Sequence, residues 1–149
     1  MEIVPFEKKD AKVWDDFCAN SDEAWFWHTS KWLRYTLDYK PELKPESKSF
    51  YVINDNKIIA VCPLIIEQSA GAKELSFGNS FGPVPAFANG LTNKTRDKAA
   101  KEVFGHIDDL AKINGVKRAR FRFVVLDKLS MDTNPRRFNY LMKFGYIDS

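Results

Sequence analysis

The sequence is poor in cysteine and histidine, and this scarcity excludes several kinds of site. Of its 149 residues only Cys18 and Cys62 are cysteines, and only two are histidines. The cysteines do not form the Cys-x-x-Cys spacing of zinc and thiol redox sites. No Ser-His-Asp arrangement, P-loop or nucleophilic cysteine motif is recognisable. We therefore expect no metal site and no self-sufficient set of catalytic residues in this domain.

Long apolar runs are also missing. The segment Met1–Asp10 has neither the basic region nor the apolar region of a secretory signal. The longest apolar run is far shorter than the roughly 20 residues that a membrane-spanning helix needs. We expect no membrane insertion, and the low cysteine content favours a cytoplasmic location.

Charge of one sign does not dominate either. The 23 basic and 20 acidic side chains are interspersed, with a net charge of +3 and without a long basic run, so nothing indicates a nucleic-acid-binding arm. Aromatic residues, in contrast, make up 14% of the chain and include 12 phenylalanines and 4 tryptophans. The length and this apolar content predict one domain over residues 1–149 with a core rich in rings.

The first half of the sequence predicts a strand, two helices and a meander. We expect a strand over 2–6, a helix that begins after Asp10 with Val13, Trp14 and Phe17 on one face, and a second helix that Thr29 or Ser30 caps and Pro41 ends. Residues 41–47 are expected to form a polar loop. A hairpin over 50–53 and 57–62 continues through Pro63 to Ile66, and a further strand covers 73–77.

The second half of the sequence predicts a crossover connection, in which a long helix joins two strands. The glycines and prolines of residues 78–90 predict a long connection without helix or strand. An apolar stripe predicts a helix over 93–113, and clean alternation predicts one strand over 116–125 with its arginines on one face. A last helix is expected to begin at Asn134 and to bury Phe138, Leu141 and Met142 before Gly145 ends it.

Four short motifs, together with this order of elements, resemble those of a known protein family. They are Trp14-Asp15-Asp16-Phe17, Trp27-His28-Thr29-Ser30-Lys31-Trp32, Ile59-Ala60-Val61-Cys62-Pro63-Leu64 and Phe81-Gly82-Pro83. The order resembles the GNAT acyltransferase fold without its last strands, and the motifs resemble the N-terminal half of FemAB-like tandem-GNAT acyl and aminoacyl transferases. The resemblance implies an α/β (α+β) fold, a GNAT-like mixed sheet flanked by helices.

The resemblance also implies a function and partners. Such a half-domain moves an acyl or aminoacyl group onto an amine of a cell-envelope or surface-polysaccharide precursor, with the substrate in a cleft beside a second GNAT-like domain or another copy. Acyl-CoA or aminoacyl-tRNA would be the donor in a complete protein. The Gln/Arg-x-x-Gly-x-Gly/Ala turn that binds the pyrophosphate of acetyl-CoA is missing between Phe77 and the long helix, so we expect no cofactor in this domain.

Several residues are candidates for substrate binding, each with a structural alternative. His28 is placed to donate to a substrate or to act as a base, or else to serve as a cap or a packed ring. Trp32 and Tyr35 form a stacking wall or part of the core. The loop Ser80-Phe81-Gly82 presents backbone donors or is simply a turn, and Arg122, with Arg118 and Arg120, attracts an anion or protects the solvated face of an edge strand.

Two functions from different classes therefore remain open. The first is an acyl or aminoacyl transferase half-domain, whose catalysis rests on positioning and so needs few acid or base residues. The second is a GNAT-like binding or docking module without catalysis, which the missing phosphate turn favours. No nucleic-acid partner is expected apart from a charged tRNA as donor.

Overall fold

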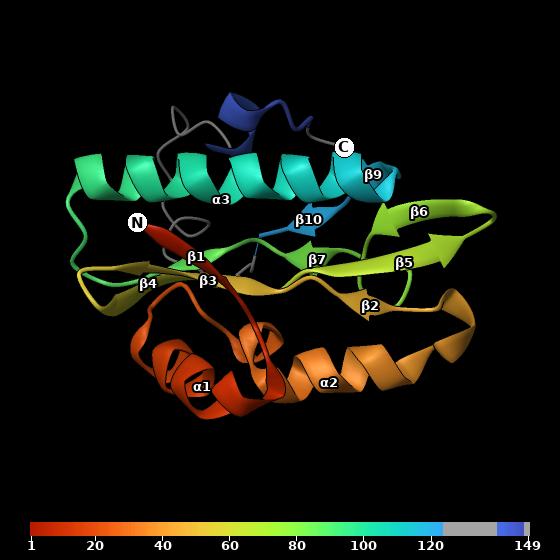
Figure 1. Cartoon of the computed structure of the whole chain (residues 1–149), viewed down its shortest axis with the longest axis horizontal. Helices are drawn as coiled ribbons and strands as arrows, with labels where there is room; N and C mark the ends of the chain where they lie inside the picture. Colours follow the sequence, from red (N-terminus) through yellow and green to blue (C-terminus); the bar gives the residue numbers. More distant parts are fainter. Residues whose placement is uncertain (124–139, 148–149) are drawn as a thin grey trace.

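The protein has a mixed α+β fold in which helices cover both faces of a layer of strands (Figure 1). The structure is a computed structural model that describes residues 1–123 and 140–147. Helices α1 (Ala11–Asn20) and α2 (Ser30–Tyr39) lie on one face of the strands, and α3 (Asn93–Asn114) lies on the other. The expected α+β class is therefore confirmed, but the expected mixed sheet is divided into three small sheets.

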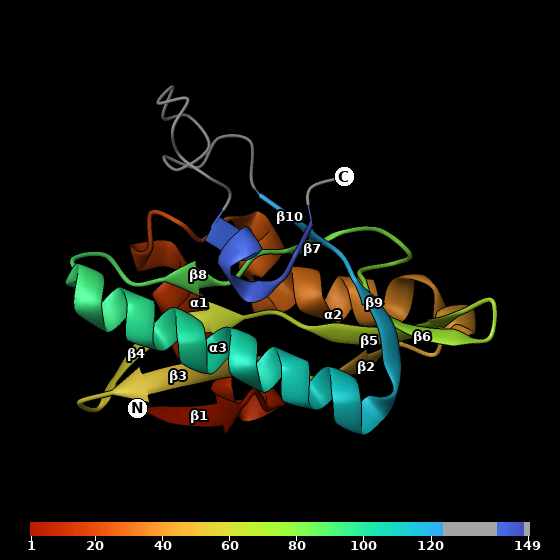
Figure 2. The ribbon, with the colours of Figure 1, turned by 90° about the horizontal axis from the view of Figure 1, so that it is seen from above.

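The strands of the described residues form three small sheets. The first has the order β1-β3-β4-β8, the second β2-β5-β6-β9, and the third is the pair β10-β7 (Figure 2). Pairs β6–β9 and β7–β10 are parallel and the others are antiparallel. The bounds are β1 Glu2–Pro5, β2 Glu46–Ser47, β3 Phe50–Asn54, β4 Lys57–Cys62, β5 Ile65–Ser69, β6 Ala72–Leu75, β7 Gly82–Pro83, β8 Ala86–Phe87, β9 Val116–Ala119 and β10 Phe121–Arg122.

The predicted hairpin is confirmed, and its turn residues explain it. Asp55 and Asn56 join β3 to β4 with φ angles of 49° and 59°. Positive φ at both central residues is the requirement of the two-residue turn that matches strand twist, and Asp and Asn tolerate it.

Strands β4 and β5 are separated by Pro63, where one continuous strand was expected. Proline has no N–H to donate to the ladder. Beside it, the Leu64 N–H donates to the Ser49 hydroxyl over 2.9 Å, and that hydroxyl lies 3.2 Å from the Leu64 carbonyl oxygen. Ser49 therefore supplies hydrogen bonds at the point where the chain passes from the first sheet to the second.

Three other predictions about strands and loops were wrong in detail. Residues 78–90 contain β7 and β8, because neighbouring strands supply ladder partners to this proline-rich connection. The strand expected over 116–125 breaks at Arg120, whose N–H donates to Leu75 and whose carbonyl accepts from Gly82, so the chain changes partner from β6 to β7. The expected polar loop 41–47 includes a 3-10 turn, Pro41–Leu43, and β2.

The capping residues predicted the ends of α2 and α3 correctly, whereas the predicted buried face of α1 is only partly correct. Thr29 caps α2, and Gly115, with φ 67°, ends α3. On α1, however, Trp14 and Cys18 are buried while Val13 is exposed. Most of the helix expected from Asn134 lies outside the described residues; Tyr140–Phe144 form a 3-10 helix.

That 3-10 helix contributes one of the side chains expected to pack. Leu141 is buried, as predicted, but Met142 is half exposed. The remaining expected residue, Phe138, lies outside the described residues.

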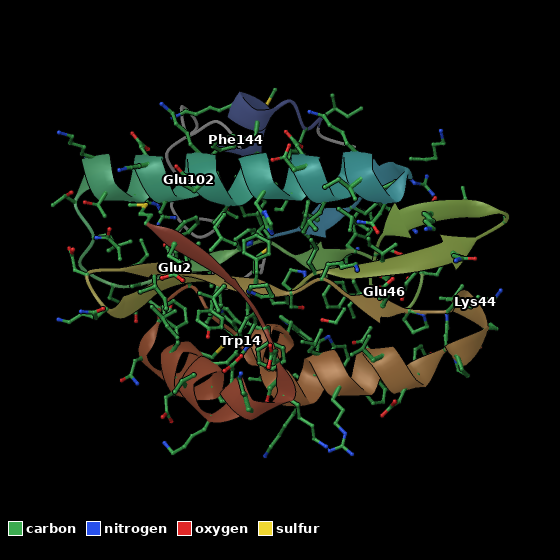
Figure 3. The ribbon with its side chains drawn as sticks, in the orientation of Figure 1. Glu2, Trp14, Lys44, Glu46, Glu102 and Phe144 are labelled. Carbon is green, nitrogen blue, oxygen red and sulfur yellow. The ribbon has the colours of Figure 1, made fainter. Side chains whose placement is uncertain are left out.

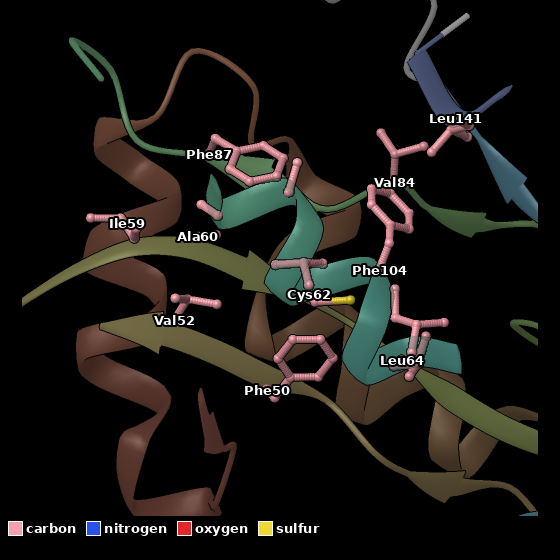
Figure 4. Packing of buried hydrophobic residues seen from close by; sticks show 14 of the residues in the cluster. Phe50, Val52, Ile59, Ala60, Cys62, Leu64, Val84, Phe87, Phe104 and Leu141 are labelled. Atoms are coloured by element: carbon pink, nitrogen blue, oxygen red, sulfur yellow. The ribbon is translucent and has the colours of Figure 1, made fainter. Parts of the chain in front are cut away.

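The core lies on both faces of the strand layer. Trp14 lies between the strands and the helices α1 and α2 (Figure 3), and its indole N–H donates to the His28 carbonyl over 2.6 Å. On the opposite face, Phe104 of α3 packs with Phe50 of β3 and with Val84, which lies between β7 and β8 (Figure 4). Because both faces are covered, the central strands need continuous apolar runs, which explains the sequence of β4.

Candidate functional site

An apolar hollow of about 410 Å³ lies between the segment before α2 and the β7–β10 pair, and we call it the aromatic pocket. Such a volume is typical of small-molecule sites, which span about 300–1,000 Å³. Segments that are far apart in the sequence meet here. Its lining consists of Trp25, Trp27, Trp32, Phe77, Ser80, Phe81, Gly82, Pro83, Arg122 and Phe123.

Five of the seven residues predicted from the sequence line this pocket: Trp32, Ser80, Phe81, Gly82 and Arg122. Tyr35 lies beside it, since its ring stacks on Trp32 at 5.0 Å, and Tyr39 stacks on Tyr35 at 5.4 Å. The two tyrosines are half exposed, so they continue the aromatic wall along the surface of α2. The remaining residue, His28, is not part of the lining.

His28 is buried beneath the pocket with both ring nitrogens engaged. Its Nδ1 accepts from the Trp25 N–H over 2.9 Å, so Nε2 carries the proton and donates to the Val84 carbonyl over 2.8 Å. Burial lowers the pKa of His28 to about 4. A neutral, fully bonded imidazole of this kind holds Trp25 and Val84 in place, and it has no ring nitrogen left for a substrate.

The loop before β7 is held by a carboxylate that sequence reasoning missed. Glu67 is buried and accepts hydrogen bonds from the Ser76 hydroxyl and from the Gly78 and Asn79 N–H groups, the last over 2.9 Å. The Ser80 N–H donates to the Phe77 carbonyl. These amides are thus engaged within the chain, and the loop offers the pocket its shape and side chains rather than these backbone donors.

Gly82 is required by a close approach inside the pocket. A Cβ atom at this position would lie 2.8 Å from two carbons of the Phe77 ring. That distance is below van der Waals contact, so any side chain here would displace the Phe77 ring, which lines the pocket. Gly82 also donates its N–H to the Arg120 carbonyl, which fixes β7 beside β10.

The predicted arginine stripe divides into two functionally different parts. Arg118 and Arg120 each donate to Glu74 over 2.8 Å, one to each carboxylate oxygen, and thereby neutralise a buried acid. Arg122 has no carboxylate partner among the described residues. Its guanidinium lies 4.7 Å from the centre of the Phe81 ring at the rim of the pocket.

One further donor in the pocket wall lacks a partner. The indole Nε1 of Trp25 is buried and forms no hydrogen bond within the part of the chain that the structure describes. A buried N–H without a partner costs about 1–3 kcal/mol. No sequence signal distinguishes this indole from the other tryptophans, because the cause is its surroundings.

The titratable groups near the pocket limit its chemistry. The lining residues within 1–123 and 140–147 include no carboxylate, histidine or thiol. Cys18 and Cys62 are buried elsewhere, and burial raises the pKa of the Cys18 thiol to about 12. The arrangement is therefore suited to binding a ring-containing or apolar ligand and to holding a negative charge beside Arg122.

Within residues 1–123 and 140–147, no three or more His, Cys, Asp or Glu side chains gather so that they could hold a metal ion. No helix in that part of the chain has the length and apolar character needed to cross a membrane. Comparison with models of protein families, with curated proteins and with solved structures found no significant match to this chain.

Proposed function

We propose that this chain is the substrate-binding half of an acyl or aminoacyl transferase that acts on an amine of a cell-envelope or surface-polysaccharide precursor. The aromatic pocket carries this proposal. The motifs around Trp32 and Phe81-Gly82-Pro83, which suggested a FemAB-like half-domain, lie far apart in the sequence and meet at one hollow. A connection from β6 through α3 to the parallel strand β9 is also what a GNAT-like order requires.

The proposal assigns the donor to another domain or another copy. Glu67 occupies the amides of Gly78 and Asn79, the place where a phosphate would need backbone donors. Acyl-CoA or aminoacyl-tRNA is therefore held elsewhere, and this chain orients the acceptor amine next to it. Orientation of two reactants contributes strongly to such transfers and requires few acid or base groups.

The test is a transfer assay on the complete gene product, with labelled acyl-CoA or aminoacyl-tRNA and an amine-bearing sugar or peptide precursor. We expect transfer by the wild type and a loss of about tenfold or more in kcat/KM for Trp32→Ala, which removes a pocket wall. Ile113→Ala, which truncates an exposed side chain on α3, is the control and should leave transfer unchanged. Absence of transfer from both donors would refute the proposal.

A second candidate is a binding or docking module without catalysis. The observation that favours it is that none of the described lining residues has a side chain that exchanges a proton near neutral pH. Under this alternative the precursor binds with the same dependence on Trp32, while no donor supports transfer. Binding measured by calorimetry beside the transfer assay therefore separates the two functions.

A further inference from the structure

The described part of the aromatic pocket carries one positive charge and no negative one. Among the lining residues that the structure describes, only Arg122 has a charged side chain. The two neighbouring arginines of the same chain segment share the carboxylate of Glu74 and are not among the lining residues, so Arg122 is the arginine that a ligand in the pocket meets. A ligand that enters the pocket thus meets an uncompensated cation, which favours a negatively charged group.

The guanidinium is also positioned, because it lies against an aromatic face. Arg122 lies 4.7 Å from the centre of the Phe81 ring, and Arg120 lies 5.9 Å from the same centre. Contact with a ring restrains the planar guanidinium while its N–H groups stay available to a carboxylate or phosphate. The charge at the rim is therefore held in one region of the pocket mouth.

The wall of the pocket is mostly aromatic. The Trp25 indole N–H is buried and lacks an acceptor among the described residues, so its signal can report on changes in the pocket wall. The lining is mostly rings, on which a flat ligand body would stack. One cation at the rim and the aromatic faces beside it define a ligand class.

We infer that the pocket selects small ligands that combine a carboxylate or phosphate with a planar ring, the anion bound by Arg122 and the ring stacked on the aromatic lining. The inference rests on the proposed function only in taking the aromatic pocket as the substrate site. It adds the chemical class of the substrate portion bound there. Arg122 discriminates by charge rather than by transfer chemistry.

The test uses ring-bearing probes in nuclear magnetic resonance titrations of the whole chain. Phenyl phosphate and phenylacetate represent the two anions, and phenylacetamide is the neutral counterpart of phenylacetate. The indole N–H signal of Trp25, assigned with Trp25→Phe, should shift saturably with at least one anion. Phenylacetamide should bind about tenfold or more weakly than the better anion, since charge-assisted hydrogen bonds are about twice as strong as neutral ones.

Variants test the charged anchor. Arg122→Gln should weaken binding of the better anion about tenfold and reduce its preference over phenylacetamide, while Arg118→Gln, which removes the same charge outside the pocket, should not. The Trp14 indole signal, whose N–H donates to the His28 carbonyl, reports in every variant that the fold is intact. Equal affinity for charged and neutral probes, an unmoved Trp25 signal, or equal effects of the two arginine variants would overturn the inference.

The outcomes also separate this inference from the proposed function. Anion-selective binding without any acyl transfer would support the inference and refute the transferase. Transfer to a precursor that binds with no dependence on Arg122 would support the transferase and refute the inference.

Discussion

The imidazole of His28 is buried as a neutral group, and this has a measurable consequence for stability. Its pKa falls from 6.5 to about 4 on folding, so the unfolded chain binds a proton that the folded chain does not bind between those values. Stability from this group is complete above about pH 6.5 and is lost as the pH falls toward about 4. From this group alone we expect about 2 kcal/mol less stability at about pH 5 than at about pH 7.

The measurement is urea unfolding of the wild type, His28→Gln and His106→Gln at both pH values. His28→Gln removes the titrating group and should flatten this part of the profile, although it lowers stability at neutral pH. His106 is only partly buried, so His106→Gln should keep the His28 contribution. If His28→Gln and wild type lost the same free energy on acidification, the neutral buried state would be wrong.

Candidate residues could be predicted from the sequence where residue type alone limits the role. Trp32, Phe81 and Gly82 stood out because aromatic rings and glycine in loops are unusual, and they line the aromatic pocket. Glu67 and the Trp25 indole could not be found in this way. Their importance depends on burial and on which partners lie nearby, and no local pattern encodes either.

At the scale of elements, Ser49 compensates for the proline between β4 and β5. Its hydroxyl accepts from the Leu64 N–H and is almost fully buried. Ser49→Ala leaves that N–H without its partner, so we expect a loss of about 1–3 kcal/mol in unfolding free energy. Ser49→Thr, which keeps the hydroxyl, should recover part of this loss, whereas equal stability of Ser49→Ala and wild type in chemical denaturation would contradict the role.

Two glycines in different elements should respond to alanine in opposite ways. At Gly82 the new methyl group would meet the Phe77 ring at 2.8 Å, so we expect Gly82→Ala to cost about 1–3 kcal/mol and to weaken probe binding in the aromatic pocket. Gly105 lies in the interior of α3 with open space around it. Gly105→Ala should stabilise the protein by about 1 kcal/mol and leave binding unchanged.

Thermal unfolding together with a probe titration checks both variants of this pair. A destabilised Gly82→Ala that binds as tightly as wild type would show that the ring moves away from the pocket. A destabilised Gly105→Ala would mean that the open space beside α3 is filled.

Strand boundaries were harder to predict than helix boundaries, and the reason is physical. Thr29 and Gly115 mark helix ends through local capping, which the sequence displays directly. The break at Arg120 depends on which strand lies alongside, since its N–H and carbonyl bond to different neighbours. Pairing partners come from residues far away in the chain, so alternation alone predicted one uninterrupted strand.

At the scale of the whole molecule, the two helical layers are joined around the β8 edge of the first sheet. Glu23 follows α1 and Arg96 lies in the first turn of α3, and these two helices cover opposite faces of the strands (Figure 1). The Arg96 guanidinium donates to both oxygens of Glu23, once over 3.1 Å, and lies 4.6 Å from the centre of the Phe87 ring. Glu23 also accepts from the Phe87 N–H.

Arg96→Lys should weaken this connection although it keeps the charge. An ammonium group cannot donate to both carboxylate oxygens in the parallel geometry of a guanidinium, nor stack its plane on Phe87. We expect a loss of about 1–2 kcal/mol in urea unfolding and faster hydrogen exchange in the first turns of α3. Arg34→Lys, an exposed substitution on α2, should change stability by less than about 0.5 kcal/mol. Equal effects of the two substitutions would mean that the layers are held together by apolar packing alone.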